Sequence, residues 1–340
     1  MEASLAVVIL NWNGQKWLEQ FLPTVVKYSE PYRVVLADNA STDQSIEWTK
    51  SNFPNVEIVV NEQNGGFAKG YNDALKKIDA EFYLLLNSDV EVTPNWIEPL
   101  LKHMENPKIA SIQPKVLSFN RRDEFEHAGA SGGFIDKYHY PFCRGRLINS
   151  FEKDELQYDY VSNVFWTTGA CMLVRSKVYW EVGGLDERFF AHMEEIDWCW
   201  KVQRAGYELL VEPKSVVYHV GGGTLNYENP RKTFLNFRNS LLMIHKNQVS
   251  GLWYVLFRRL ILDGIAGLIF LFSGKFSHFI AVIKAHFSFY GLLSSSRVER
   301  KKWKHLNQNV SKGVYKGSLL WIYFVQKTKK FSEINTRRFL

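Results

Sequence analysis

The chain has 340 residues, 46% hydrophobic and 15% aromatic, so it can bury a sizeable core and is not a disordered chain. Its three cysteines include no CxxC pair, which excludes a disulfide scaffold and a cysteine-based zinc site. The net charge of +7 is unevenly divided: residues 1–240 carry 25 basic and 32 acidic side chains, and residues 241–340 carry 17 and 3. We therefore expect a compact acidic domain over 1–240 and a basic segment over 241–340 that suits an anionic surface.

Strands and helices alternate in the pattern of the first ninety residues. Short apolar runs predict buried strands at 5–10, 33–37, 56–60 and 82–86. Apolar residues at helical spacing predict helices around 17–25, 45–51 and 68–78. This alternation is typical of an α/β fold with a doubly wound, mostly parallel sheet.

Each of these predicted strands is followed by polar residues or glycines. They are Asn11, Asp38, Asn64 with two glycines, and Asp89. Ordinary turn chemistry explains such residues singly, but carboxylates recur where glycine or proline would serve a turn equally well. Ligands of doubly wound sheets bind beyond the carboxyl ends of the strands, so a nucleotide pocket is expected there. The dinucleotide fingerprint GxGxxG does not follow the first strand.

The second half of the acidic region is less regular. Residues 120–160 are predicted to form a long loop or flap, and 164–175 is a further apolar segment. A helix is expected within 187–206, followed by a final strand at 209–218. That strand leads to His219 and to the glycines at 221–223.

Three groups of residues in this region are suited to chemistry. Asn87-Ser88-Asp89 ends a strand, where a carboxylate beside a phosphate site can hold Mg²⁺ or Mn²⁺. Residues 192–197 contain three acids at a predicted helix start, which the helix dipole explains only in part. Their aromatic surroundings are apolar enough to raise a carboxyl pKa toward the range of a general base. His219, at a strand end beside glycines, can approach a ligand or a metal closely.

Seven stretches in this order resemble the inverting family 2 glycosyltransferases, in particular their rhamnosyltransferase-like subgroup. They run through the chain from residue 5 to about residue 240. The stretches are Val7–Gly14, Val35–Asp43, Asn64–Ala74, Leu84–Val92, Thr167–Arg175, Gly183–Gly206 and Val216–Gly223. The resemblance implies the GT-A fold for residues 1–240, followed by C-terminal amphipathic helices.

The resemblance also implies roles for individual residues. Asp89 matches the main metal ligand, with His219 completing a Mg²⁺ or Mn²⁺ site, although Asn87 replaces the first acid of the family motif. Glu195 matches the catalytic base, and Asp197 is the second candidate for that role. The residues expected to bind the nucleotide sugar are Asn11, Asp38, Asp43, Gly66, Ala68, Asn72, Asn87, Ser88 and Gly169.

The implied activity is that of a metal-dependent, hexosyltransferase-type enzyme of cell-surface glycan synthesis. It would move a sugar from dTDP-rhamnose or a UDP-sugar to a hydroxyl of a saccharide acceptor, expected to be lipid-linked. A polyprenyl-phosphate glycosyltransferase is one alternative, because an ionised phosphate acceptor needs no base. A catalytically inactive sugar-nucleotide-binding protein is another, because Asn87 stands in place of an acid.

The basic segment contains two apolar, aromatic stretches at 252–272 and 276–290 and a basic cluster at 297–304. Arg258, Arg259 and Asp263 interrupt the first stretch, so we expect an interfacial helix rather than a membrane span. An anionic membrane surface is the predicted partner; ordinary packing on the catalytic domain is the alternative. Nucleic acid is not expected, because no RNA- or DNA-binding signature accompanies the charge. With no signal peptide in the N-terminal pattern, the predicted location is cytoplasmic, peripheral on the inner face of the cell membrane.

Overall fold

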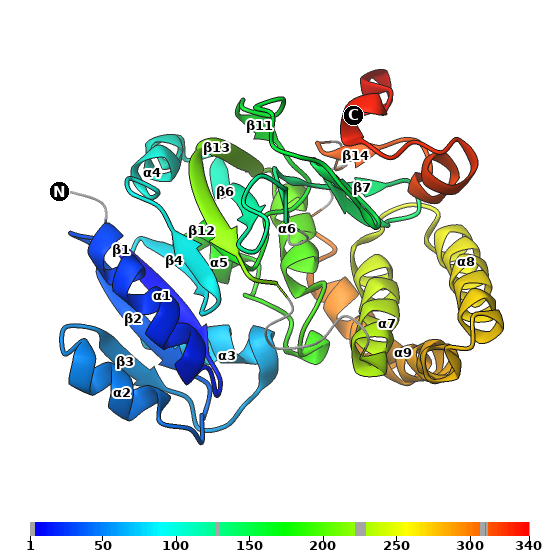
Figure 1. Ribbon diagram of the computed structural model, residues 1–340. Coiled ribbons are helices and arrows are strands. Elements are labelled where there is room, and N and C mark those ends of the chain that lie inside the picture. The colour runs from blue at the N-terminus through cyan, green and yellow to red at the C-terminus, as the bar shows by residue number, and fades with distance from the viewer. Residues whose placement is uncertain (1–3, 127–128, 222–228, 307–309, 311, 340) are drawn as a thin grey trace.

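The structure is a computed structural model with two β-sheets and a C-terminal group of helices (Figure 1). The nine-stranded sheet and the five-stranded sheet share one body, and the last helices lie to one side of it. The residues it describes are 4–126, 129–221, 229–306, 310 and 312–339. Gly222 and Gly223, which belong to one of the stretches quoted above, lie outside the described residues.

The large sheet has the strand order β11-β13-β6-β12-β4-β1-β2-β3, with β5 paired to β13. Its first half, β3-β2-β1-β4, is parallel as expected, whereas β12 runs antiparallel to both β4 and β6. Its strands are β1 (Leu5–Asn11), β2 (Arg33–Asp38), β3 (Glu57–Val60), β4 (Phe82–Asn87), β5 (Val90–Val92), β6 (Ile109–Ser118), β11 (Ser162–Asn163), β12 (Cys171–Arg175) and β13 (Glu208–His219).

Helices cover both faces of this sheet, because both faces of its strands are apolar. In β1, Val7 and Ile9 belong to one core, and Ala6 and Val8 belong to the other. The first core is covered by α1 (Gln15–Tyr28), α2 (Ser45–Asn52) and α4 (Glu98–Met104). The second is covered by α3 (Gly66–Leu75), α5 (Ser176–Glu181), α6 (Glu194–Arg204) and α7 (Pro230–Asn247).

The elements predicted for the first ninety residues are all present, within three residues at each end. The sequence pattern predicts no strand at β6, although β6 lies in the middle of the sheet. Its apolar run is interrupted by Gln113 and Lys115, which are both buried. The backbone N–H of Thr168 donates to Gln113, and Asp154 accepts from Lys115, so partners distant in sequence make this polar strand possible.

The prediction of a long loop over 120–160 is wrong for residues 133–151, which contain four short strands of a second sheet. Strand β14 (Val314–Tyr315), from the C-terminal end of the chain, completes it beside β7. Strands of two to four residues, separated by turns with positive φ at His139, Gly145 and Ile148, are too short to show a hydrophobic period. The other strands are β7 (Gly133–Asp136), β8 (Pro141–Cys143), β9 (Arg146–Leu147) and β10 (Ser150–Phe151).

The boundary predicted between residues 240 and 241 falls inside α7, and the described structure has no break there. Residues 241–244 of this helix are fully buried in the core of the large sheet. Beyond α7, helices α8 (Leu252–Phe272) and α9 (Phe276–Lys302) extend away from the sheets (Figure 1). The chain then returns to the second sheet through β14 and the short helices η2 (Trp321–Val325), η3 (Phe331–Glu333) and η4 (Thr336–Arg338).

Candidate active site

The carboxyl ends of β1, β4 and β13, the start of the antiparallel β12, and the starts of α3, α6 and α7 surround one cavity of about 650 Å³. This is the edge at which ligands of a doubly wound sheet bind. The predicted site residues that line the cavity are Asn11, Gly66, Asn87, Ser88, Asp89, Gly169, Glu195 and His219.

Two carboxylates predicted to bind the nucleotide fix turns beside the cavity. Asp38 is fully buried, and it accepts hydrogen bonds from the Asn11 side chain (3.1 Å) and the Ser41 backbone N–H (2.8 Å). Asp43 accepts from the backbone N–H of Gln15 (3.1 Å) at the start of α1. Neither carboxylate is part of the cavity lining; both hold the loop after β2, and a contact with the nucleotide stays a prediction.

Three further predicted site residues also lie off the cavity. Ala68 is fully buried in the core, and Asn72 bonds to the backbone of Leu185 through both its amide nitrogen and its oxygen. Asp197 is fully buried, with Lys246 Nζ at 2.6 Å from its Oδ2. A carboxylate held in a buried ion pair is not available to accept a proton from a substrate, so the structure does not support Asp197 as the base.

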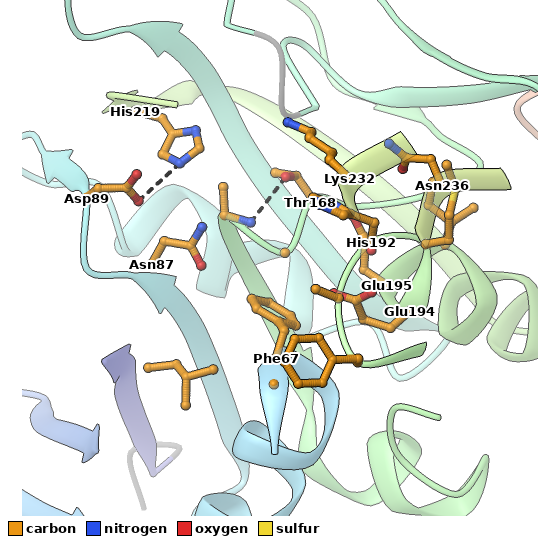
Figure 2. A pocket seen from close by; sticks show the side chains of 18 of the residues that line it. Phe67, Asn87, Asp89, Thr168, His192, Glu194, Glu195, His219, Lys232 and Asn236 are labelled. Atoms are coloured by element: carbon orange, nitrogen blue, oxygen red, sulfur yellow. Dashed lines mark hydrogen bonds and ion pairs between the residues drawn. The ribbon is translucent and has the colours of Figure 1, made fainter. Parts of the chain in front are cut away.

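At one end of the cavity, His219 lies between two carboxylates. Its Nε2 is 3.2 Å from Asp89 Oδ1 (Figure 2). Its Nδ1 is 3.1 Å from Glu126 Oε2. Burial lowers the pKa of His219, but the two negative charges outweigh burial and raise it well above the ordinary value. This end of the cavity therefore stabilises one positive charge, which a proton or a metal ion can supply.

The donor set at this end fits a divalent ion that is completed by substrate oxygens. Among the described residues there is no group of three or more His, Cys, Asp or Glu side chains arranged to hold a metal. Asp89 and His219 nevertheless converge, and Glu126 orients the ring from behind, as carboxylates do for metal-binding histidines. Mg²⁺ and similar ions often bind through one or two protein ligands together with phosphate oxygens of the substrate.

At the other end of the cavity, two carboxyl groups start α6 (Figure 2). The Oε2 atoms of Glu194 and Glu195 are buried, with no hydrogen-bond partner in the described part of the chain. Burial raises the pKa of Glu195 to about 7. Burial, together with the neighbouring Glu195 charge, raises the pKa of Glu194 well above its ordinary value. A carboxyl group with a pKa near neutrality is suited to take a proton from a hydroxyl group.

The loop before α6 has an unusual backbone that places these carboxyl groups. Phe190, His192 and Met193 all have left-handed φ values, between 63° and 73°. The Phe190 carbonyl accepts a 2.7 Å hydrogen bond from the backbone N–H of Phe67 in α3. A Cβ at Gly66 would lie 2.4 Å from that same carbonyl oxygen, so only glycine allows this approach.

Several cavity residues were not predicted as site residues from the sequence. Asn39, at the end of β2, is one of them, and its side chain donates a 3.0 Å hydrogen bond to the side chain of Asn64 after β3. Others come from α7, which lies beyond every site residue that the sequence predicted. The spacing of Lys232, Asn236 and Asn239 on one helical face is the signal that could have indicated this polar side of α7. The unpredicted lining residues include Asn39, Glu126, Lys232 and Asn236.

The profile of the family "Glycosyl transferase family 2" matches residues 6–183, more than half of the chain. The chain belongs to this family of transferases. It is 27% identical over 237 residues to the N-acetylglucosaminyl-diphospho-decaprenol L-rhamnosyltransferase of Mycobacterium tuberculosis, covering 63% of this chain and 75% of the relative. It is 19% identical over 222 residues to rhamnosyltransferase WbbL of Escherichia coli, covering 63% and 82%.

Two solved structures resemble this chain in fold over different shares of its length. A mannosyltransferase from Pyrobaculum calidifontis, in complex with GDP-Man and Mn²⁺, has a TM-score of 0.53 at 13% identity and covers 90% of this chain and 85% of that one. GalNAc-T7 with UDP, GalNAc and Mn²⁺ has a TM-score of 0.56 at 18% identity, covering 72% of this chain and 48% of the longer neighbour. These neighbours confirm the predicted GT-A fold.

Replacing Gly66 with alanine should disturb the contact between α3 and the loop before α6. The new methyl group would sit at a φ of +78° and 2.4 Å from Phe190 O, so we expect unfolding free energy to fall. Left-handed strain alone costs about 1–3 kcal/mol. Gly291→Ala is the matched control, since nothing lies within 4 Å of its added methyl group. Urea unfolding of both variants is the measurement, and equal stability losses would contradict the assigned close approach.

Proposed function

We propose that the enzyme is an inverting glycosyltransferase that uses dTDP-rhamnose or a UDP-sugar and glycosylates a hydroxyl of a lipid-linked saccharide. The observation that carries this proposal is the arrangement of one cavity, with Asp89 and His219 at one end and Glu195 at the other (Figure 2). The mycobacterial relative, by its name, transfers L-rhamnose to N-acetylglucosaminyl-diphospho-decaprenol, a lipid-linked sugar. That name supports this choice of donor and acceptor class for cell-surface glycan synthesis.

The nucleotide would bind along the ends of β1, β2 and β3. Asn11, Asn39 and Asn64 line this part of the cavity and supply neutral donors and acceptors for a base and a ribose. Trp12 also lines the cavity and is 46% exposed, so its ring is available for stacking on a base. Asp38 holds Asn11 in place through their 3.1 Å hydrogen bond.

The diphosphate would lie at the His219 end of the cavity. Asp89 and His219 would hold Mg²⁺ or Mn²⁺ there, and Glu126 would fix the ring orientation. When bound, such an ion supplies positive charge for the diphosphate leaving group. Asn87 and Ser88 line the cavity beside Asp89, and they would orient the sugar diphosphate through neutral hydrogen bonds.

The acceptor would enter against the start of α6. The Glu195 carboxylate takes the proton of the acceptor hydroxyl while the hydroxyl oxygen bonds to the anomeric carbon. The bond from that carbon to the diphosphate oxygen breaks on the opposite side, and the nucleoside diphosphate leaves with the electron pair. One displacement inverts the anomeric centre and leaves Glu195 protonated.

A thermal-shift screen tests the donor and the metal together. We expect a dTDP- or UDP-sugar with Mn²⁺ to raise the melting temperature more than either component alone, because ligands that bind the native state stabilise it. Asp89→Asn should lose the response to Mn²⁺, while Asp43→Asn, which lies off the cavity, should retain it. Full Mn²⁺-dependent stabilisation of Asp89→Asn would contradict the metal assignment.

Glu195→Gln should bind the donor normally and lose most turnover, since general-base assistance contributes roughly 10²–10⁴-fold. Initial rates of nucleoside diphosphate release with saturating acceptor measure the loss. Because the free carboxyl has a pKa of about 7, kcat/KM of the wild-type enzyme should fall as the pH decreases below that value. An unchanged rate in Glu195→Gln would instead favour a phosphate acceptor, which is already ionised.

We propose in addition that α8 and α9 hold the enzyme on an anionic membrane surface. Two of the three charged residues that interrupt the α8 sequence face the protein. They are Arg259 and Asp263, whose Nε and Oδ1 atoms form a buried 2.8 Å ion pair. The opposite face of α8 carries five large, exposed apolar side chains at spacings of three, four and seven residues. They are Tyr254, Phe257, Ile261, Leu268 and Phe272, which are between 48% and 85% exposed.

Helix α9 continues this apolar surface with Phe276, Phe287 and Tyr290. It is the one described helix that is long and apolar enough to cross a membrane by length and composition. Its other face, which includes Val282 and Phe289, is buried within the protein, and this favours an interfacial position. The exposed charged residues of 252–290 are Arg258, Lys275 and Lys284, all positive. The inner face of the cell membrane remains the predicted location.

Flotation with vesicles tests this surface. The protein should float with vesicles that contain phosphatidylserine and should be released by salt, because each basic residue near such a surface contributes about 1 kcal/mol. Phe257→Ser with Phe287→Ser should abolish flotation, whereas Leu156→Ser, which changes an equally exposed apolar residue elsewhere, should not. A wild-type chain that stays in the soluble fraction at low salt would contradict membrane attachment.

A further inference from the structure

We propose that Asn239 of α7 is a positioning residue that holds the loop before α6 and thereby sets the place of Glu195. This inference rests on the proposed function, because it assigns Asn239 a role in the same transfer reaction. Asn239 lies beyond every site residue predicted from the sequence, and it does not line the cavity itself.

The amide nitrogen of Asn239 contacts the backbone of residues 189–192, the loop before α6. Its Nδ2 lies 3.0, 2.9 and 2.7 Å from the carbonyl oxygens of Phe189, Ala191 and His192. Its Oδ1 accepts a 2.9 Å hydrogen bond from Arg238 Nε, which fixes the amide with its nitrogen toward the loop. The side chain is fully buried, so water does not compete for these bonds.

The loop depends on these bonds because its backbone is strained. The carbonyl that Asn239 does not reach, that of Phe190, accepts from Phe67 N in α3. Four consecutive carbonyls, from residue 189 to residue 192, therefore have donors in α3 and α7. Left-handed conformations at non-glycine residues persist only where the surroundings determine them, and here α3 and α7 provide that constraint.

The loop connects directly to the proposed base. Met193 ends it with a φ of 73°, and Glu194 and Glu195 follow as the first two residues of α6. Asn239 therefore lies close in the structure to Glu195 without touching the cavity. A displacement of about 1 Å in a catalytic group can cost about 10²-fold in rate.

Loss of the Asn239 amide should have a local effect, because α7 is also held elsewhere. Near its C-terminal end, Lys246 pairs with Asp186 and Asp197, and Asn247 donates to Asp197. These contacts do not involve the Asn239 amide, so α7 should stay docked when the amide is changed.

The test compares Asn239→Asp, which keeps the size of the side chain but removes the donors, with Asn239→Ala and with Ser240→Ala. Ser240 is the neighbouring buried residue, and its hydroxyl has no hydrogen-bond partner within the described residues. We expect both Asn239 variants to lose about 100-fold in kcat, with an unchanged KM for the donor and a shifted acid limb of the pH profile. Ser240→Ala should match the wild-type enzyme.

Hydrogen–deuterium exchange of a peptide covering residues 187–198 gives a readout that does not depend on activity. Faster exchange there, with unchanged exchange in β1 and β4, is expected for Asn239→Asp, and Asn239→Ala serves if the aspartate variant does not fold. Unchanged exchange and kcat in the Asn239 variants, or an equal kcat loss in Ser240→Ala, would overturn the proposal. If the wild-type enzyme transfers no sugar while loop exchange still rises, the proposed function fails and the role of Asn239 in holding the loop stands.

Discussion

The buried contact between α6 and α7 is the interaction on which the site depends. Lys246 lies between Asp186 and Asp197, and all three side chains are less than a tenth exposed. Burial disfavours each of these charges, but their mutual attraction outweighs it, raising the pKa of Lys246 and lowering that of Asp186. Removing one partner from such a group leaves an uncompensated buried charge, which costs roughly 3–5 kcal/mol. The contact fixes α7 against α6, and α7 brings Lys232 and Asn236 to the cavity and Asn239 to the loop.

One end of the cavity favours a positive charge, and the other end disfavours a negative charge. At one end, Asp89 and Glu126 favour a positive charge at His219. At the other, burial disfavours negative charge: it raises the pKa of Glu195 to about 7 and, together with the neighbouring Glu195 charge, that of Glu194 well above its ordinary value. A donor with a charged diphosphate and an acceptor with a neutral hydroxyl match these two environments. In the proposed mechanism, the cavity would thus separate stabilisation of the leaving group from removal of the proton.

The charge asymmetry of the chain also has a structural explanation. Arg259 and Asp263 are paired inside the protein, where Arg259 Nη1 also donates to the carbonyl of His139 at 3.2 Å. The exposed charges of 252–290 are then all positive and flank an apolar surface. The basic cluster at the end of α9 is partly used within the protein, since Arg300 donates to the carbonyl of His245 in α7. The C-terminal hundred residues therefore contribute an exposed apolar and basic surface, and they also pack against the rest of the protein.

The sequence alone determined the alternating strands of the first ninety residues and the positions of Asn11, Asp89, Glu195 and His219 at element ends. Those features follow from local hydrophobic periodicity and from turn residues that lie next to it in the chain. The tertiary structure decided the central strand β6, the second sheet, the constraint on Asp197 and the contribution of α7. Each depends on a partner distant in sequence. In β6, Gln113 accepts from Thr168; in the second sheet, β7 pairs with β14; and Asp197 accepts from Lys246 of α7. A buried polar side chain or a two-residue strand is unstable unless a partner satisfies its hydrogen bonds. No local sequence pattern shows which residue that partner is.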